Sequence, residues 1–207
     1  MKTVKSEVME YTPQKCIINP KVLGIAFHEM HKLEIQIIAG KLQSLNSNCK
    51  YFHKPSDQMN LLISQDSKLT PLVLLALVRD AFIVKPSFAF ESQDKKRISQ
   101  PDAHEVAYFP KKCERTRNLK NSLNNLKLAI DVFGKSASHT FLGDPIFEQV
   151  IAEMGGGLVR RICDSDFIIS DKNEKLAAST VFKKVHFMWL VDSLLKNILL
   201  PVQDYYF

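Results

Sequence analysis

The chain has 207 residues, of which 45% are hydrophobic and 24% charged, and a formal net charge of +6. This length suits one large domain or two small ones, and the composition excludes collagen-like, low-complexity and wholly disordered chains. The positive charge favours anionic partners such as nucleic acid or phosphorylated peptides, without choosing between them. The longest apolar run, Leu72 to Val78, is too short to span a bilayer, so we expect a soluble intracellular protein without membrane contact.

Cysteine spacing and motif content argue against an enzyme. The four cysteines, Cys16, Cys49, Cys113 and Cys163, form no CxxC pair and no cluster with zinc-ligand spacing, which indicates reduced thiols and no metal. The sequence has no Walker A motif, no nucleophile elbow and no kinase signature. We therefore expect neither a cofactor nor catalysis.

In the first half, the apolar pattern predicts the order strand, helix, strand, strand, helix, strand, followed by a short helix from Ser87. Thr70 before Pro71 is typical of an N-cap followed by proline at the first helical position. Gly40 is expected to end the first helix. The predicted strands are Lys21–Phe27, Leu42–Leu45, Asn60–Ser64 and Ala81–Val84, and the helices Glu29–Gly40 and one opening at Pro71.

The second half repeats this order. Asp144 and Pro145 are expected to cap a helix that stops at the glycines 155–157. Between the halves, the polar and basic connector is expected to hold one helix around Arg115–Lys127. The predicted strands are Ala129–Phe133, Leu158–Ile162, Asp166–Ser170 and Val185–Phe187, and the other helices Lys175–Lys183 and one from Trp189.

These patterns define an α/β fold class. Strands that are apolar throughout and alternate with helices indicate a small, mainly parallel sheet flanked by helices in each half. We expect an internal duplication, with a first repeat over 18–92, a basic linker over 93–127 and a second repeat over 128–207. The apolar helix from Pro71 to Asp80 is expected to pack against helices of the second repeat.

The second half resembles the BRCT repeat. The resemblance lies in Met-Gly-Gly-Gly at 154–157, Asp-Phe-Ile-Ile-Ser at 166–170 and Val-x-Phe-x-Trp-Leu-x-Asp-Ser-Leu at 185–194. The first half looks like a divergent copy, with Ala39-Gly40 in place of the glycine pair and Phe88 where the family usually has tryptophan. Trp189 is interpreted as a buried structural anchor.

The resemblance implies a tandem BRCT module, as in DNA-damage-repair and cell-cycle-checkpoint scaffold proteins of the nucleus. Many such tandems bind a phosphoserine or phosphothreonine peptide between the repeats. The implied partner is a phosphorylated protein or a chromatin-associated peptide, and the module is expected to be a monomer.

The family's phosphate pocket uses a Ser/Thr-Gly pair after the first strand and a lysine early in the second helix of the first repeat. Here the pair position is assigned to Leu23-Gly24, which lacks the hydroxyl, and Leu72 stands at the lysine position. The first-repeat candidates are Gly24, Lys68 and Thr70. Thr70 suits a plain N-cap equally well.

The second repeat offers an alternative pocket with Gly134, Ser136 and Lys175. Two functions of other kinds stay open. A phosphate-independent scaffold would explain the apolar Leu23 and Leu72. Direct DNA binding would use the basic linker residues, which also suit the acidic flanks of a peptide. These linker residues are Lys111, Lys112, Arg115 and Arg117.

Overall fold

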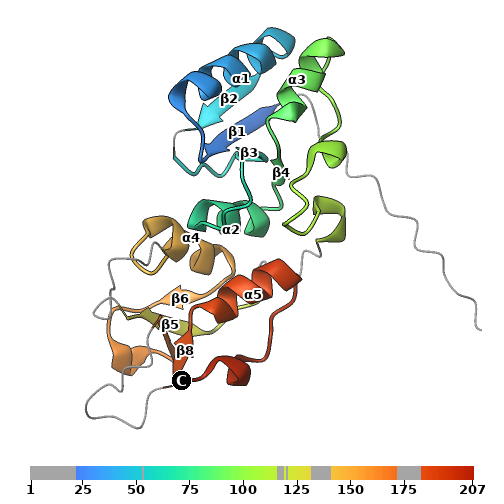
Figure 1. The fold of residues 1–207 in the computed structure, drawn as a ribbon. Coiled ribbons are helices and arrows are strands. Elements are labelled where there is room, and N and C mark those ends of the chain that lie inside the picture. Colours follow the sequence, from blue (N-terminus) through green and yellow to red (C-terminus); the bar gives the residue numbers. More distant parts are fainter. Residues whose placement is uncertain (1–21, 53, 116–118, 120, 132–140, 172–182) are drawn as a thin grey trace, which may run out of the picture.

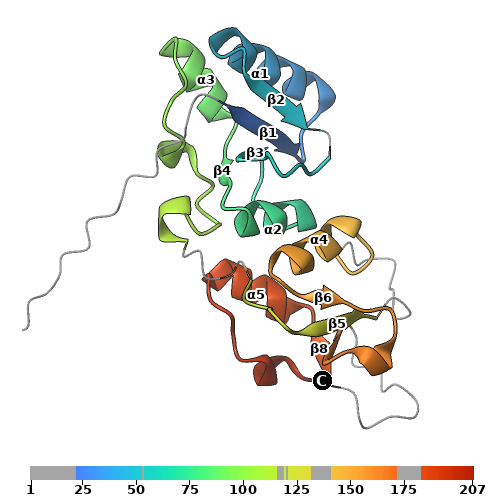
Figure 2. The ribbon, with the colours of Figure 1, turned by 180° about the vertical axis from the view of Figure 1, so that it is seen from behind.

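The computed structural model describes residues 22–52, 54–115, 119, 121–131, 141–171 and 183–207. Two four-stranded parallel sheets, each flanked by helices, lie at opposite ends of the molecule with helices packed between them (Figures 1 and 2). The α/β fold class predicted from the apolar strand pattern is confirmed. Among the described residues, no helix is long and apolar enough to cross a membrane.

The first sheet has the strand order β2-β1-β3-β4, with every pair parallel. Its strands are β1 (Leu23–His28), β2 (Cys49–Phe52), β3 (Leu61–Ser64) and β4 (Phe82–Val84). Its helices are α1 (Lys32–Leu45), α2 (Pro71–Val78) and α3 (Ser87–Asp94). Helices α1 and α3 cover the outer face of this sheet, and α2 covers the face toward the second sheet (Figure 2).

The second sheet has the matching order β6-β5-β7-β8, again all parallel. This repetition is what the predicted duplication requires. The strands are β5 (Lys127–Ile130), β6 (Gly157–Leu158), β7 (Phe167–Ser170) and β8 (Lys184–His186), and the helices α4 (Pro145–Glu153) and α5 (Met188–Lys196). The predicted boundary after 92 lies two residues before the end of α3, and the predicted boundary before 128 lies one residue inside β5. The predicted start of the first repeat at 18 lies outside the described residues.

Three sequence predictions in the first repeat and the linker are wrong. Helix α1 continues through Gly40, and the segment Leu42–Leu45 is its last turn and not a strand. Leu42 continues the buried stripe of Ile38, and its full burial outweighs the cost of about 1 kcal/mol for a glycine inside a helix. The second strand is Cys49–Phe52. In the range of the predicted linker helix, residues 121–125 form turns and Lys127 already belongs to a strand, while 116–118 and 120 lie outside the described residues.

In the second repeat, the predicted strand over Leu158–Ile162 is shorter than expected. Strand β6 covers only Gly157–Leu158, and a 3-10 turn begins at Ile162. Of the predicted helix over Lys175–Lys183, only Lys183 is described, and it lies outside any helix.

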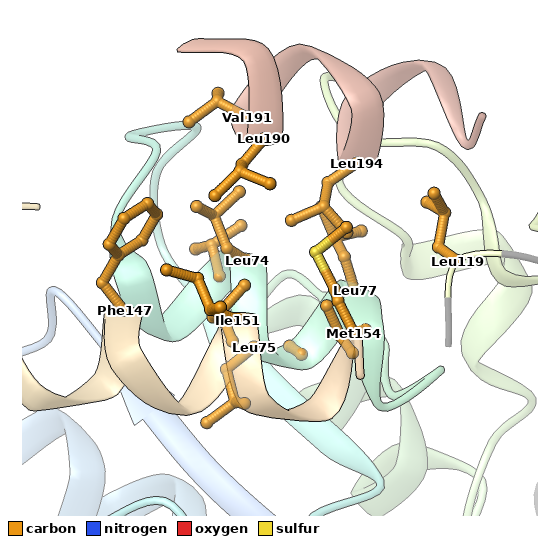
Figure 3. Packing of buried hydrophobic residues seen from close by; sticks show 14 of the residues in the cluster. Leu74, Leu75, Leu77, Leu119, Phe147, Ile151, Met154, Leu190, Val191 and Leu194 are labelled. Atoms are coloured by element: carbon orange, nitrogen blue, oxygen red, sulfur yellow. The ribbon is translucent and has the colours of Figure 1, made fainter. Parts of the chain in front are cut away.

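Helix α2 joins the two repeats. Seven of its eight residues are buried, and it packs against α4 and α5 of the second repeat, as predicted (Figure 3). Side chains from the three helices share one apolar cluster. Figure 3 labels Leu74, Leu75 and Leu77 of α2, and Leu190, Val191 and Leu194 of α5. It also labels Phe147 and Ile151 of α4, Met154 directly after α4, and Leu119 of the linker.

Capping and anchoring residues in the second repeat act as predicted. The side chain of Asp144 accepts a hydrogen bond of 2.8 Å from the N–H of Ile146 at the start of α4. Gly155 follows α4 with a φ of +88°, a conformation that favours glycine. Trp189 is 2% exposed, and its Nε1–H donates a hydrogen bond of 2.8 Å to the carbonyl oxygen of Leu200.

Candidate functional site

A group of polar side chains lies where β1 and β3 end, beside the start of α2. In parallel sheets, the loops at the carboxyl ends of the strands bring residues from distant parts of the chain together. Here His28 ends β1 and is paired with Ser64, which ends β3, while Thr70 is the N-cap residue of α2. We call His28, Glu29, Ser64, Lys68 and Thr70 the His28 cluster.

His28 is the centre of the cluster and is only 5% exposed. Its Nδ1 lies 2.9 Å from Oγ of Ser64, and its Nε2 lies 2.8 Å from Oγ1 of Thr70. The Ser64 hydroxyl donates its hydrogen to the carbonyl oxygen of Asp66 at 2.8 Å. Nδ1 of His28 must therefore donate to Ser64. In the neutral ring, Nε2 then accepts the hydrogen of the Thr70 hydroxyl.

Burial lowers the pKa of His28 below its usual 6.5, because desolvation penalises the charged imidazolium. Glu29 and Asp66 oppose this by raising the pKa, and Lys68 adds to the lowering. The net direction favours the neutral ring at neutral pH. The hydrogen-bond pattern and the pKa shift therefore agree on a neutral His28.

Thr70 is the N-cap residue as predicted, but its hydroxyl does not cap the helix. It bonds His28, and α2 begins with Pro71 and no side-chain cap. A helix start with uncapped N–H groups favours a nearby anion. Lys68 lies beside it, with its Nζ 3.0 Å from Oε1 of Glu29, and both side chains are substantially exposed (59% and 42%). Such an exposed ion pair is weak, so Lys68 can turn to another anion at small cost.

Gly24 does not belong to this cluster. It is the second residue of β1, four residues before His28, which corresponds to about 13 Å along a strand. There its N–H donates to Oδ1 of Asn60 at 3.1 Å, and its carbonyl accepts from the N–H of the same residue at 3.0 Å. His28 therefore ends the first strand, and Glu29 holds the position directly after it, with a φ of +52°.

The corresponding place in the second repeat is acidic. Asp131 follows β5 and is 7% exposed, and its Oδ2 accepts a hydrogen bond of 3.2 Å from Oγ of Ser170 at the end of β7. Nζ of Lys184 lies 3.2 Å from the same oxygen. The predicted second-repeat residues Gly134, Ser136 and Lys175 lie outside the described residues.

The linker lysines and arginines are engaged within the protein to different degrees. Arg115 has a side chain that is 5% exposed, donates to the carbonyl oxygen of Pro110 at 3.1 Å and lies 3.7 Å from the carboxylate of Glu105. Lys112 lies 4.4 Å above the ring of Phe82. Lys111 is exposed, and Arg117 lies outside the described residues.

A cavity of about 630 Å³ lies between α2, the linker and the second repeat. Arg79 forms one wall, and its guanidinium is bound from three sides. Nε lies 2.9 Å and 3.1 Å from the two carboxylate oxygens of Glu153, Nη1 donates to the carbonyl oxygen of Ser56 at 2.6 Å, and Nη2 lies 3.0 Å from Asp57. This arginine therefore ties the repeats together and has few donors left for a phosphate.

In the part of the chain that the structure describes, no three His, Cys, Asp or Glu side chains are grouped as metal ligands. Among the described cysteines, Cys49 is buried, and burial raises the pKa of its thiol, which disfavours a nucleophilic thiolate.

Solved structures resemble this fold over nearly its whole length. The BRCT5-BRCT6 domains of S. pombe Brc1 share 13% identity, with 89% of this chain and 97% of that chain covered and a TM-score of 0.61. Rtt107p in complex with a phosphorylated histone shares 13% identity, with 89% and 91% covered and a TM-score of 0.57. The S. pombe Nbs1-Ctp1 complex shares 15% identity, with 84% and 56% covered and a TM-score of 0.52.

No protein-family model matches the sequence, and no curated protein matches it either. The fold is nevertheless a defined one. Two parallel sheets of the same strand order, joined through α2, are the architecture of the tandem BRCT module. The chain therefore has the tandem BRCT fold, as its sequence motifs predicted.

Proposed function

We propose that the protein is a protein-interaction module that binds a phosphoserine or phosphothreonine peptide at the His28 cluster. The observation that carries the proposal is the position of the exposed Lys68 two residues before Thr70, the N-cap residue at the uncapped start of α2. A phosphate dianion needs a cation, a hydroxyl donor and backbone N–H groups. This place offers Lys68 and the start of α2 directly, and the Thr70 hydroxyl once His28 is protonated. The similarity to Rtt107p, solved with a phosphorylated histone, supports the proposal.

Phosphate binding changes the hydrogen bonds of the cluster. Lys68 leaves Glu29 for the phosphate, which carries about two charges at neutral pH. The Thr70 hydroxyl has one hydrogen, and the neutral His28 ring occupies it. When His28 takes up a proton, Nε2 donates to Thr70, and the Thr70 hydrogen becomes available to the phosphate. The phosphate charge itself favours this protonation.

The geometry favours the first repeat over the second as the phosphate site. Asp131 occupies the position in the second repeat that His28 occupies in the first. The Asp131 carboxylate would repel a phosphate, and the neighbouring Lys184 lowers this repulsion only as far as it neutralises the carboxylate charge. The alternative pocket with Gly134, Ser136 and Lys175 stays a prediction, which a Lys175→Met variant tests.

The wider role follows from the same proposal. We place the protein in the nucleus, as a scaffold in DNA-damage repair or a cell-cycle checkpoint, where a phosphorylated chromatin protein is its partner. Support comes from the histone in the Rtt107p complex. An interaction module of this kind performs no catalysis.

Fluorescence anisotropy with labelled phosphopeptides tests the proposal. The probes are a phosphoserine/phosphothreonine peptide library and a phosphorylated histone peptide, each compared with its phosphatase-treated form. Phosphorylation is expected to improve affinity at least tenfold, which equals about 1.4 kcal/mol. Equal affinity for both forms would refute the proposal and favour the phosphate-independent scaffold.

Matched variants locate the binding site. Lys68→Met is expected to lower phosphopeptide affinity at least tenfold, because it removes the cation of the cluster. Lys50→Met is the control, since Lys50 is also exposed but bonds Gln58 beside β2. An equal loss in both variants would indicate only a general electrostatic attraction.

The structure weakens the two alternatives. Leu23 is fully buried within the first repeat, so it is not available to a partner, and Leu72 is half-buried. Arg115 is buried against Glu105, which leaves the described linker with less exposed positive charge than the sequence suggested. DNA binding through the linker stays testable by the salt dependence of binding to duplex DNA.

A further inference from the structure

We propose that the outer face of α1 binds an acidic amphipathic helix of a partner protein. The surface consists of Leu33, Ile37 and Gly40 on α1 together with Phe90 on α3, and we call it the α1 face. Leu33 is 72% exposed, Ile37 54% and Phe90 45%. This proposal adds a second interaction surface and does not depend on phosphate binding at the His28 cluster.

Helix α1 carries apolar side chains on two opposite sides. Ile38 and Leu42 belong to the core of the first repeat and are buried. Leu33 and Ile37 lie one helical turn apart on the other side, where both are mostly exposed to solvent. Single exposed apolar residues are common on protein surfaces, but a contiguous row of them indicates an interaction site.

Phe90 continues this row on the neighbouring helix. Helices α1 and α3 pack side by side at the end of the molecule away from the second repeat (Figures 1 and 2). Lys41, one turn after Ile37, has its Nζ 5.1 Å from the centre of the Phe90 ring. The two helices therefore contribute to one surface.

Gly40 leaves the backbone of α1 open beside Ile37. It follows Ile37 by three residues, which places it on the same side of the helix, and nothing lies within 4 Å of a Cβ added there. A glycine inside a helix costs about 0.5–1 kcal/mol relative to alanine. No contact within the described chain requires that glycine here. A partner helix can therefore pack closely against α1 at Gly40.

Positive charge predominates around the α1 face. Across α1, α3 and the residues that flank them (29–46 and 85–97), six lysines and arginines stand against four carboxylates. Lys41 bonds the neutral side chain of Gln93. Four of the other basic residues are exposed and form no ion pair within the described chain, namely Lys32, Lys85, Lys96 and Arg97.

The carboxylates in the same two ranges are mostly engaged. Asp94 is the one among the four that is exposed without a partner in the described chain. Of the others, Glu29 pairs with Lys68, Glu34 accepts the N–H of His31, and Glu91 pairs with Lys95 and His104. The unpaired charge at the rim of the α1 face is therefore mainly positive and attracts an acidic partner.

An acidic amphipathic helix satisfies both features of the α1 face. Its Leu, Ile or Phe side chains cover the apolar row, and its Asp or Glu side chains meet the basic rim. A second copy of this chain fits less well, because it would bring the same positive rim against itself. DNA would leave Leu33, Ile37 and Phe90 without an apolar partner.

Fluorescence anisotropy with helical peptides tests the inference. The probe is a library of labelled, unphosphorylated peptides about five turns long, or about 18 residues. Leu, Ile, Phe or Met stands at positions i, i+3, i+4 and i+7, and Asp, Glu, Gln or Ala elsewhere. The acidic members are expected to bind the intact chain at least about tenfold more tightly than versions with Lys in place of the acids, or than scrambled versions. The inference fails if no acidic member binds, or if the basic or scrambled versions bind equally well.

Surface variants, which leave the core intact, locate the binding. Ile37→Ser is expected to weaken peptide binding at least about tenfold, while the control Ile198→Ser, at a position 58% exposed after α5, leaves it unchanged. Gly40→Gln is expected to weaken binding as well, because its side chain blocks the close approach to α1. Lys32→Glu tests the basic rim, with Lys196→Glu on α5 as the control. Full affinity in Ile37→Ser and Gly40→Gln would overturn the inference.

The other occupants give distinct results. Analytical ultracentrifugation of the intact chain is expected to show no dimer that Ile37→Ser dissociates, and such a dimer would assign the α1 face to a second copy. Duplex DNA that displaces the acidic peptide and is released by Lys32→Glu would assign it to nucleic acid. Either result overturns the inference. Phosphopeptide affinity is expected to stay unchanged in Ile37→Ser and Gly40→Gln, so a failure here leaves the proposed function standing.

Discussion

Replacing Gly24 with alanine is expected to destabilise the protein by about 3 kcal/mol. A Cβ at this position would lie 1.9 Å from the carbonyl oxygen of Gln58, far inside van der Waals contact, and the obstacle is backbone. Overpacking of this kind costs about 1–3 kcal/mol. Displacing the segment also weakens the two hydrogen bonds between Gly24 and Asn60, each worth about 1 kcal/mol.

Gly40→Ala is the control, because nothing lies within 4 Å of its added Cβ and Gly40 lies inside α1. This variant is expected to stabilise the protein by about 0.5–1 kcal/mol. Urea unfolding followed by circular dichroism measures both changes, and a loss of 3 kcal/mol corresponds to a fall in Tm of about 6–12 °C. A Gly24→Ala variant as stable as the parent would refute the argument that the Gln58 backbone leaves no room for a side chain at position 24.

Three further predictions concern the interface and the cluster. Leu74→Ala is expected to lower the free energy of unfolding, measured in urea, by about 2–5 kcal/mol, because Leu74 is fully buried. Leu33→Ala is the control and is expected to lower it by less than about 0.5 kcal/mol, because Leu33 is 72% exposed. Because the pKa of His28 is lowered on folding, Tm is expected to fall as the pH drops below about 6.5. The variant His28→Gln should make Tm less dependent on pH in this range. An unchanged slope of Tm against pH in that variant would contradict the assignment to His28. Glu153→Gln is expected to lower the free energy of unfolding by about 1–2 kcal/mol in the same assay, because Glu153 pairs with the buried Arg79. Asp57→Asn is expected to change it little, because Asp57 is 93% exposed. Equal effects of the two variants would contradict a stabilising ion pair between Arg79 and Glu153.

The elements that could be predicted carry strong local signals. Pro71 and the Asp144-Pro145 pair mark helix starts chemically, and continuous apolar runs such as Phe82–Val84 mark buried strands. The family resemblance rested on residues that fix local backbone geometry or packing, among them Gly155 and Trp189. Such features need no knowledge of distant contacts.

The elements that were missed depend on contacts between distant residues. Gly40 is a helix breaker by propensity, yet packing of Leu42 carries α1 through it. Strand β2 is short and only partly buried, so its apolar pattern is weak, and its pairing with β1 defines it.

The sequence alone points to part of the His28 cluster. It predicts Thr70 as the N-cap residue of α2, which the structure confirms, with Lys68 two residues earlier, while the binding role of both residues stays a prediction. The motif alignment that predicts Gly24 there is five residues too early, because Leu23-Gly24 begins β1 and His28-Glu29 stands at its end. Where β1 ends is set by its pairing with β3, which brings His28 opposite Ser64. A histidine and a serine 36 residues apart carry no sequence signal of their contact.

The burial of α2 from both sides affects how the protein is made. The helix ends at Val78, but α5, which covers part of it, begins only at Met188, about 110 residues later. At about 5–20 residues per second, the ribosome needs on the order of 5–20 s to deliver that cover. During this interval the outward leucines of α2 face water. Chaperone binding, or mispairing of two nascent chains, would therefore act at this helix before the second repeat arrives.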